Sequence, residues 1–178
     1  MAERTSCAIW RMPQAEAERI KAAALHFLAY DPLSGAFTWK VRRSQKCKVG
    51  LPAGSVTVKG YVAIQIAGKS IAAHRLAWMF MTGEFPDFDV DHINMIKSDN
   101  RWENLRLATS TQNKANSGKR SDTSNPYKGI RRSGSRWRAV ITRNGVSRSF
   151  GPFPTPEQAH AAYVRAAVEL FGEFARTG

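Results

Sequence analysis

Residues 90–116, VDHINMIKSDNRWENLRLATSTQNKAN, carry the side chains best suited to chemistry on a phosphodiester bond. A neutral histidine can activate a water molecule by taking its proton, and a hard cation such as Mg²⁺ prefers carboxylate and carboxamide oxygens. Asp91 and His92 are adjacent at the end of a predicted strand, so their side chains diverge. One could therefore hold a metal ion and the other a water, with Asn113 as a further oxygen ligand.

The elements that must position this pair follow in the order strand, loop, strand and helix. The segment LRLATSTQNKANSG, residues 105–118, changes from a strand pattern to a helix pattern. Its TSTQ, residues 109–112, fits a capping box and predicts that the helix begins there, while Gly118 is placed to end it. A helix that folds back along the strands would bring Asn113 against Asp91 and His92.

The N-terminal half supplies the other predicted elements. Residues 15–30 have apolar positions at helical spacing, and YDPLSGAFTWK, residues 30–40, reads as a turn followed by a strand. Short strands separated by glycine turns are predicted over 54–73, where Val62, Ile64 and Ile66 alternate with less apolar neighbours. HRLAWMFMTG, residues 74–83, predicts a short helix with a glycine at its C-terminal cap.

The C-terminal third changes in composition after a polar, turn-rich segment at residues 117–126. Residues 127–153 predict three strands, with Asn144-Gly145 as a hairpin turn. Thr155 and Pro156 then predict the start of an amphipathic helix. In RWRAVIT, strand alternation places Arg136 and Arg138 on one face, with Trp137, Ala139 and Ile141 on the other.

Charge and cysteine usage restrict the partners and the compartment. The formal net charge is +13, and nine Lys or Arg against a single acidic residue lie between Lys119 and Arg148. Such a surface favours a polyanion, with nucleic acid the first candidate and an anionic membrane the second. There is no apolar run of membrane-spanning length and no signal-peptide layout. Cys7 and Cys47 are isolated, which predicts neither a disulfide framework nor a zinc knuckle, and favours the cytoplasm.

The first of two family resemblances lies over residues 24–116. DH, the spaced NL and QN, DNRWENLR, HRLAW and YDPLSGAFTWK resemble the HNH endonucleases of phages and introns, whose core is the ββα-metal fold. The resemblance gives His92 the role of general base, Asn104 that of a loop brace, and Asp91 and Asn113 those of metal ligands. It implies one divalent ion, Mg²⁺ or alternatively Mn²⁺, and no zinc.

Other residues near this motif have less specific roles. His74 and Arg75 are candidates to support the site from behind, and His74 could also touch phosphate or bond within the core. Asn94, Asn100 and Asn116 are candidates for loop structure or phosphate contact.

The second resemblance covers residues 125–178. YKGIRR, RWRAVI, FGPFPTPEQAHAAYVRAAVELFG and FARTG are similar to the AP2 DNA-binding domain, which reads DNA with its sheet. The sequence departs from that family around 133–135, where a tryptophan is absent, and at Ser149, so no sequence preference is implied. The resemblance makes candidate DNA contacts of Lys128, Arg131, Arg132, Arg136, Trp137, Arg138, Arg143 and Arg148.

The sequence as a whole predicts an α+β protein with an N-terminal segment 1–23, a nuclease domain 24–117, a linker 118–125 and an AP2-like domain 126–178. We expect a monomeric, metal-dependent homing endonuclease that cuts double-stranded DNA without a small-molecule cofactor or a membrane. The alternative is a non-cutting AP2-type regulator that retains an HNH scaffold. An RNA-binding module is disfavoured because the exposed aromatic residues of single-strand readers are absent.

Overall fold

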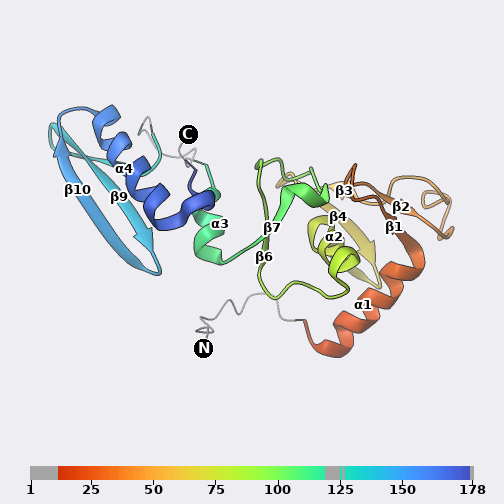
Figure 1. Cartoon of the computed structure of the whole chain (residues 1–178). Coiled ribbons are helices and arrows are strands. Elements are labelled where there is room, and N and C mark those ends of the chain that lie inside the picture. The colour runs from red at the N-terminus through yellow and green to blue at the C-terminus, as the bar shows by residue number, and fades with distance from the viewer. Residues whose placement is uncertain (1–11, 119–124, 126, 177–178) are drawn as a thin grey trace. The chain divides into compact units, whose positions relative to one another are not determined.

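The computed structural model describes residues 12–118, 125 and 127–176 (Figure 1). The chain divides into two compact units, Met1–Ala108 and Thr109–Gly178, each with its own hydrophobic core. Both units mix helices with small antiparallel sheets, as the α+β prediction expects. Across the described ranges, no helix is both long enough and apolar enough to span a bilayer.

The first unit contains two α-helices and seven strands among its described residues. In chain order they are α1 Gln14–Phe27, β1 Leu28–Tyr30, β2 Phe37–Trp39, β3 Ser55–Val56, β4 Val62–Ile66, β5 Lys69–Ala72, α2 Ala73–Thr82, β6 Asp89–His92, the 3-10 turn η1 Trp102–Asn104 and β7 Leu105–Ala108.

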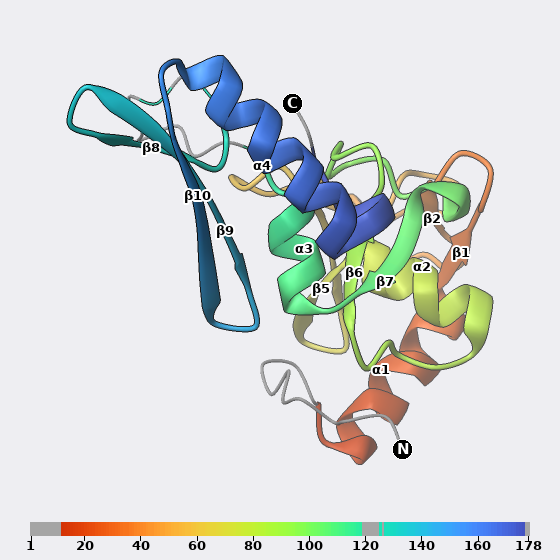
Figure 2. The same cartoon turned by 60° about the vertical axis from the view of Figure 1, so that its left-hand side comes forward.

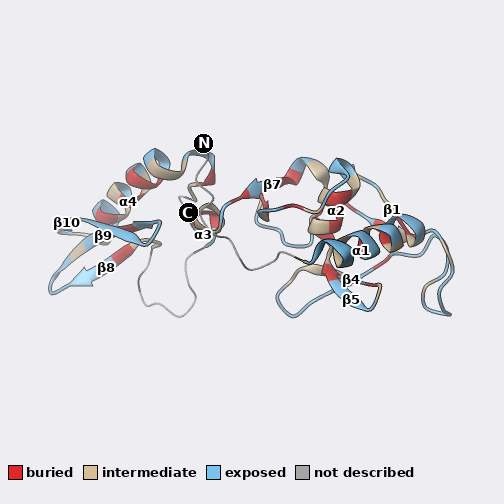
Figure 3. Ribbon diagram, turned by 90° about the horizontal axis from the view of Figure 1, so that it is seen from below, coloured by how far each residue is buried: buried red, intermediate tan, exposed pale blue. Residues whose placement is uncertain are grey.

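Three antiparallel sheets make up this unit: β1 with β2, β3-β4-β5, and β6 with β7. Alternation along β4 buries Ile64 and Ile66, as the strand period predicts. These side chains join Ile20 of α1 and Leu76 of α2 in one apolar core. Figure 3 shows buried stretches, in red, on both of these helices. The helices and the central sheet thus form a scaffold behind the β6–β7 hairpin.

The N-terminal helix is part of this scaffold. α1 buries Ile20 and Ala24 fully, and both belong to the core of the first unit. The expected division after residue 23 therefore falls within a helix, because the apolar stripe of α1 needs the rest of the unit to cover it. Residues 1–11 of the expected N-terminal segment lie outside the described residues.

The second unit contains three strands and two α-helices among its described residues. They are α3 Ser110–Asn116, β8 Ile130–Ser133, β9 Arg136–Arg143, β10 Val146–Phe153, α4 Pro156–Phe171 and the 3-10 turn η2 Gly172–Phe174. The antiparallel sheet has the order β10-β9-β8, and α4 packs on one face of it (Figure 2).

Local sequence signals place the ends of these elements. Asn144 and Gly145 both have positive φ, 51° and 81°, which suits the two-residue turn between β9 and β10. Thr155 caps α4 by accepting a hydrogen bond from the Gln158 backbone nitrogen at 3.3 Å. Ala139 and Ile141 of β9 pack with Tyr163 of α4 in the core. The predicted strands, turn and helix of this unit are all present.

The position of α3 differs from the expected domain division. We expected this helix within a nuclease domain that ends at 117, whereas it clusters with the C-terminal elements and contacts α4 and η2. Lys128 donates hydrogen bonds to the carbonyl oxygens of Ala115 and Ser117, the latter at 2.7 Å. The last carbonyls of a helix lack partners within it, so the ammonium fixes the end of α3. Residues 119–124, most of the expected linker, lie outside the described residues.

Candidate active site

The β6–β7 hairpin positions Asp91 and His92 side by side at the C-terminal end of β6. Asp91 is directly opposite Arg106 in the pairing register, and His92 is opposite Leu105. Only 7% of Asp91 and 4% of His92 is exposed, which is unusual for residues of these types. Burial of a polar side chain is unfavourable unless partners satisfy it, so the partners of each are decisive.

Asp91 forms an ion pair with the guanidinium of Arg106. Its Oδ2 atom accepts a hydrogen bond from Nε at 3.1 Å and also lies 3.1 Å from Nη2. The side chains are only 7% and 13% exposed, so solvent screens the pair weakly. Carboxylate oxygens are also the ligands that hard cations prefer. The donor chemistry of Asp91 therefore fits a hard cation as a further partner.

His92 lies among polar and aromatic groups. Its Nε2 atom is 3.3 Å from Oδ1 of Asn100, and its ring centroid is 5.1 Å from that of His74 and 6.0 Å from that of Tyr61. Burial lowers the pKa of His92 below its usual value, although the Asn100 hydrogen bond and the charge of Asp91 oppose this shift. His92 is therefore a neutral imidazole at neutral pH, as a general base must be.

His74 comes from the first turn of α2 and approaches His92 edge to face. Burial, and then the proximity of His92, lowers the pKa of His74 to about 3. Its Nδ1 atom is buried and has no hydrogen-bond partner within the described part of the chain. The next residue, Arg75, bonds the carbonyl oxygens of Pro86 and Phe88 at 2.9 and 3.4 Å. It thereby holds the chain that leads into β6.

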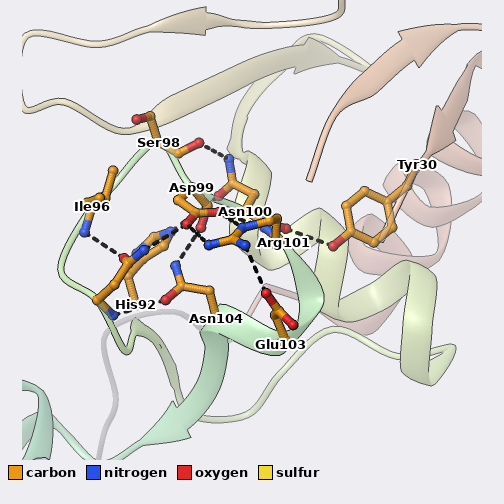
Figure 4. Close-up of polar contacts among 10 residues, drawn as sticks. Tyr30, His92, Ile96, Ser98, Asp99, Asn100, Arg101, Glu103 and Asn104 are labelled. Atoms are coloured by element: carbon orange, nitrogen blue, oxygen red, sulfur yellow. Dashed lines mark hydrogen bonds and ion pairs between the residues drawn. The ribbon is translucent and has the colours of Figure 1, made fainter. Parts of the chain in front are cut away.

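Asn104 bridges the two ends of the loop between β6 and β7 (Figure 4). Its Oδ1 accepts from the Asn94 backbone nitrogen at 2.9 Å, and its Nδ2 donates to the Asp99 carbonyl at 2.8 Å. With 4% exposure it is buried, so these backbone groups rely on it instead of water. These contacts brace the loop, and the part that Asn104 plays in the reaction stays a prediction.

Asp99 organises the same loop through its carboxylate. Arg101 donates to it from Nε and Nη2 at 2.9 and 2.8 Å, and Asn94 donates from Nδ2 at 2.7 Å. The Arg101 hydrogen bond is the main reason that the pKa of Asp99 lies well below its usual value. Asp99 thus remains charged and keeps the loop closed across the working pH range of proteins.

The β1–β2 turn supports the loop from outside. Tyr30 donates its hydroxyl to the Asn100 carbonyl at 2.7 Å, and the Trp102 backbone nitrogen donates to the Pro32 carbonyl at 3.0 Å. Gly35 lies so close that a Cβ there would overlap the backbone of Asn100 and Arg101. Burial raises the pKa of Tyr30 to about 12, so its hydroxyl stays protonated as a donor. We call residues 30–35 the support turn.

Asn113, the other predicted metal ligand, lies half-buried on α3. α3 begins with the predicted capping box, in which Thr109 and Gln112 bond each other's backbone nitrogens. Because α3 belongs to the second unit and the two units are not placed relative to one another, the meeting of Asn113 with Asp91 and His92 stays a prediction.

The predicted DNA contacts lie on both sides of the C-terminal sheet. The pairing register places Arg131 directly opposite Arg138, on the face that α4 leaves open together with Arg136. These three arginines are exposed. The alternate positions, which share the side of the buried Ala139 and Ile141, are Arg132, Trp137, Arg143 and Arg148.

Lys128 lies apart from both groups. Its ammonium is engaged by the α3 carbonyls, and burial lowers the pKa of Lys128 to about 8. This residue therefore has a structural partner within its own unit.

Two residues near His92 were not singled out for their roles by the sequence. Arg106 pairs with Asp91, and Asn100 contacts the His92 ring. The register of the predicted hairpin could have identified Arg106. A register with Asp91 opposite residue 106 places the two opposite charges together. For Asn100, no sequence pattern distinguishes a contact with the His92 ring from the hydrogen bonds that asparagine commonly forms within loops.

A family model described as HNH endonuclease matches residues 72–115. The match extends from the end of β5 into α3 and includes Asp91, His92, Asn104 and Asn113. The region that carries the site is thus similar to HNH endonuclease domains.

A relative with the same description is similar over a longer stretch. An uncharacterized HNH endonuclease of Acanthamoeba polyphaga mimivirus is 40% identical over 119 residues, which are 65% of this chain and 61% of the relative. The chain therefore aligns with less than two thirds of that relative. No solved structure matches this chain. Among the described residues there is no group of three or more His, Cys, Asp and Glu side chains that could hold a metal ion.

Proposed function

We propose that this protein is a metal-dependent endonuclease that hydrolyses phosphodiester bonds in double-stranded DNA. The observation that carries the proposal is the buried Asp91–His92 pair at the end of β6, in which the imidazole is kept neutral. His92 accepts the proton of the attacking water. Asn104 keeps the loop in the conformation that presents His92.

The residues suited to a divalent cation are Asp91 and Asn113. A carboxylate and a carboxamide are the oxygen donors that Mg²⁺ or Mn²⁺ prefers, and they leave room for phosphate oxygens as further ligands. When bound, the ion neutralises charge that develops on the phosphate. Arg106 keeps Asp91 oriented by holding its Oδ2 atom. This donor set lacks the thiolates of structural zinc sites.

The second unit positions the nuclease on its substrate. Arg131, Arg136 and Arg138 form an exposed basic set on the open face of the sheet, which we call the arginine face. Guanidinium groups suit phosphate and guanine because they present paired donors. We infer an AP2-like DNA-binding domain and a homing-type nuclease of phage or bacterial origin, acting as a monomer in the cytoplasm.

The test is cleavage of supercoiled plasmid with Mg²⁺ and with EDTA. We expect nicked or linear product with Mg²⁺ only, and no product from His92→Ala or Asp91→Ala. Both variants should still shift duplex DNA in a gel, because the arginine face is unchanged. A folded wild-type protein that binds DNA and leaves it intact with Mg²⁺ and with Mn²⁺ would instead establish the non-cutting regulator.

A further inference from the structure

We propose that Met95 and Ile96 form an apolar wedge that inserts between base pairs of duplex DNA beside the phosphate to be cut, while Lys59 and Lys97 bind neighbouring phosphates. All four residues belong to the first unit. That DNA is the molecule that meets this surface rests on the proposed nuclease function.

The loop that follows β6 turns its apolar side chains outward. Ile93, Met95 and Ile96 are 45%, 41% and 56% exposed, whereas Asn94 between them is half-buried. A single exposed apolar residue is ordinary. Three of them within four positions are a concentration of the kind that marks an interaction site.

Hydrogen bonds hold the backbone of this loop in one shape. Asn94 accepts from the Ile96 backbone nitrogen at 2.9 Å and donates from Nδ2 to the Asp99 carboxylate at 2.7 Å. The Met95 backbone nitrogen donates to the His92 carbonyl at 3.0 Å, and that of Asp99 donates to the Ile96 carbonyl at 2.9 Å. The apolar side chains are therefore displayed on a fixed backbone, which lowers the entropy lost on binding.

The backbone of Met95 is unusual for a residue with a side chain. Its φ of 64° lies in the left-handed region, which glycine and asparagine adopt more readily. The turn itself therefore does not favour methionine. Strained positions of this kind occur where a protein clamps a ligand, and a flexible, apolar methionine suits contact with an irregular surface.

Two ammonium groups lie beside the wedge. Lys97 directly follows Ile96, donates to the Lys59 carbonyl at 3.0 Å, and lies 5.0 Å from the centre of the Tyr61 ring. The Tyr61 ring is in turn 6.0 Å from that of His92. Lys59 is exposed on the turn between β3 and β4. Among residues 12–118, 125 and 127–176, neither lysine pairs with a carboxylate, so both charges suit phosphate.

The place of the loop in the chain identifies duplex DNA as its partner. The phosphodiester must reach His92, and Ile96 lies at most about 15 Å away, since consecutive Cα atoms are about 3.8 Å apart. That span equals about four to five base-pair steps of about 3.4 Å each. Isoleucine and methionine are among the side chains that proteins insert between base steps, which partly unstacks the bases.

The experiment measures binding of the full-length protein to two short duplexes without divalent metal, so that no cutting is needed. The duplexes share one sequence and differ by a single central mismatch, where the bases are already easier to unstack. Wild type should bind the mismatched duplex at least about threefold more tightly, because part of the cost of unstacking is absent there.

Met95→Asn with Ile96→Ser should abolish this preference, and asparagine tolerates the backbone of residue 95. Ile96→Ser alone, an exposed change, should remove part of it. Val49→Ser with Leu51→Ser is the matched control, because these apolar residues are similarly exposed, at 63% and 44%, and it should keep the preference.

A wild type without the preference overturns the proposal, as does a double wedge variant that keeps it or a control that loses it equally. A wedge variant that changes the oligomeric state in size-exclusion chromatography and keeps the mismatch preference would show a protein interface instead.

The two lysines are tested by Lys59→Gln with Lys97→Gln. This variant should weaken binding to both duplexes and flatten the slope of log affinity against log salt by about 1.8, at about 0.9 for each phosphate contact. The mismatch preference should remain. An unchanged slope overturns the role given to the lysines.

Plasmid cleavage separates this inference from the proposed function. A wild type that shows the mismatch preference and never cuts with Mg²⁺ or Mn²⁺ refutes the nuclease function and supports the wedge. A wild type that cuts and shows no preference does the reverse.

Discussion

At the scale of single residues, the ion pair between Asp91 and Arg106 is buried, with side chains only 7% and 13% exposed. Arg106→Leu should lower the free energy of unfolding by about 3–5 kcal/mol, because it leaves a buried carboxylate without its cation. The double variant Asp91→Asn with Arg106→Leu should lose much less than the sum of the single changes. Urea denaturation of the four proteins measures this coupling, and simple additivity would contradict a direct pair.

His74 makes stability depend on pH in a defined window. Its folded pKa is lowered to about 3, so between about pH 6.5 and 3 the unfolded chain binds a proton that the folded chain does not. Stability is therefore present above this window and is lost as the pH falls through it. His74→Phe should reduce the slope of unfolding free energy against pH by about 1.4 kcal/mol per unit. Urea titrations between about pH 4 and 6 measure it, and an unchanged slope would contradict the burial of a neutral His74.

At the scale of elements, the loop between β6 and β7 depends on Asn104. Asn104→Ala leaves two backbone groups without their buried partner, at about 1–3 kcal/mol for each. The melting temperature should fall by at least about 4 °C, and the amide of Asn94 should exchange faster with deuterium. Glu103→Ala, an exposed change in the same loop, should leave both nearly unchanged. An unchanged melting temperature with weaker metal binding would exchange the roles of Asn104 and Asn113.

Much of this element structure could be predicted because its signals are local. Alternating apolar residues predicted β4, and the Asn144-Gly145 dipeptide predicted the β9–β10 turn. Threonine caps predicted where α3 and α4 begin. The assignment of α3 to the second unit could not be predicted in the same way. It depends on the long-range contact from Lys128, whose charge alone pointed to DNA.

The candidate site was predictable to a similar extent. Asp91 and His92 stand out as a pair in the sequence, and their burial gives the pair its chemistry. The contact from Asn100 and the support of Tyr30 depend on three-dimensional packing, since the two are 70 residues apart. The spacing of residues along the sequence does not predict such a contact.

At the scale of the whole molecule, the division of the chain predicts where it can be cut. A fragment of residues 109–178 should unfold cooperatively and bind duplex DNA without cleaving it. A fragment of 125–178 should be less stable, because it lacks α3 and leaves the partly buried ammonium of Lys128 without its carbonyl partners. Thermal melts followed by circular dichroism compare them, and equal stability would show that α3 contributes nothing to this unit.

The two faces of the C-terminal sheet offer a charge-matched test of DNA binding. Arg136→Gln with Arg138→Gln removes two charges from the arginine face, while Arg132→Gln with Arg148→Gln removes two from the other face. The first pair should flatten the slope of log affinity against log salt by about 1.8, since each phosphate contact contributes about 0.9. The second pair should change it much less.

The readout is a salt titration of the 109–178 fragment on two unrelated duplexes. A uniform loss on both indicates phosphate contacts, and a larger loss of discrimination than of slope indicates base contacts. Equal effects from the two double variants would argue against a single binding face. A folded fragment with no affinity at low salt would contradict the DNA-binding assignment.

The support turn determines how long a segment must be to carry the candidate site into another protein. Residues 72–115 contain the whole motif, yet the backbone that fixes Asn100 is held by Tyr30, Pro32 and Gly35, far outside it. A segment of residues 72–115 placed in an unrelated protein would contain the side chains of the motif but not the support turn that holds the backbone of their loop. A chimaera that reuses this candidate site must therefore carry residues 14–116 together, and Gly35→Ala in that segment should inactivate it, because a Cβ at residue 35 would overlap the backbone of Asn100 and Arg101.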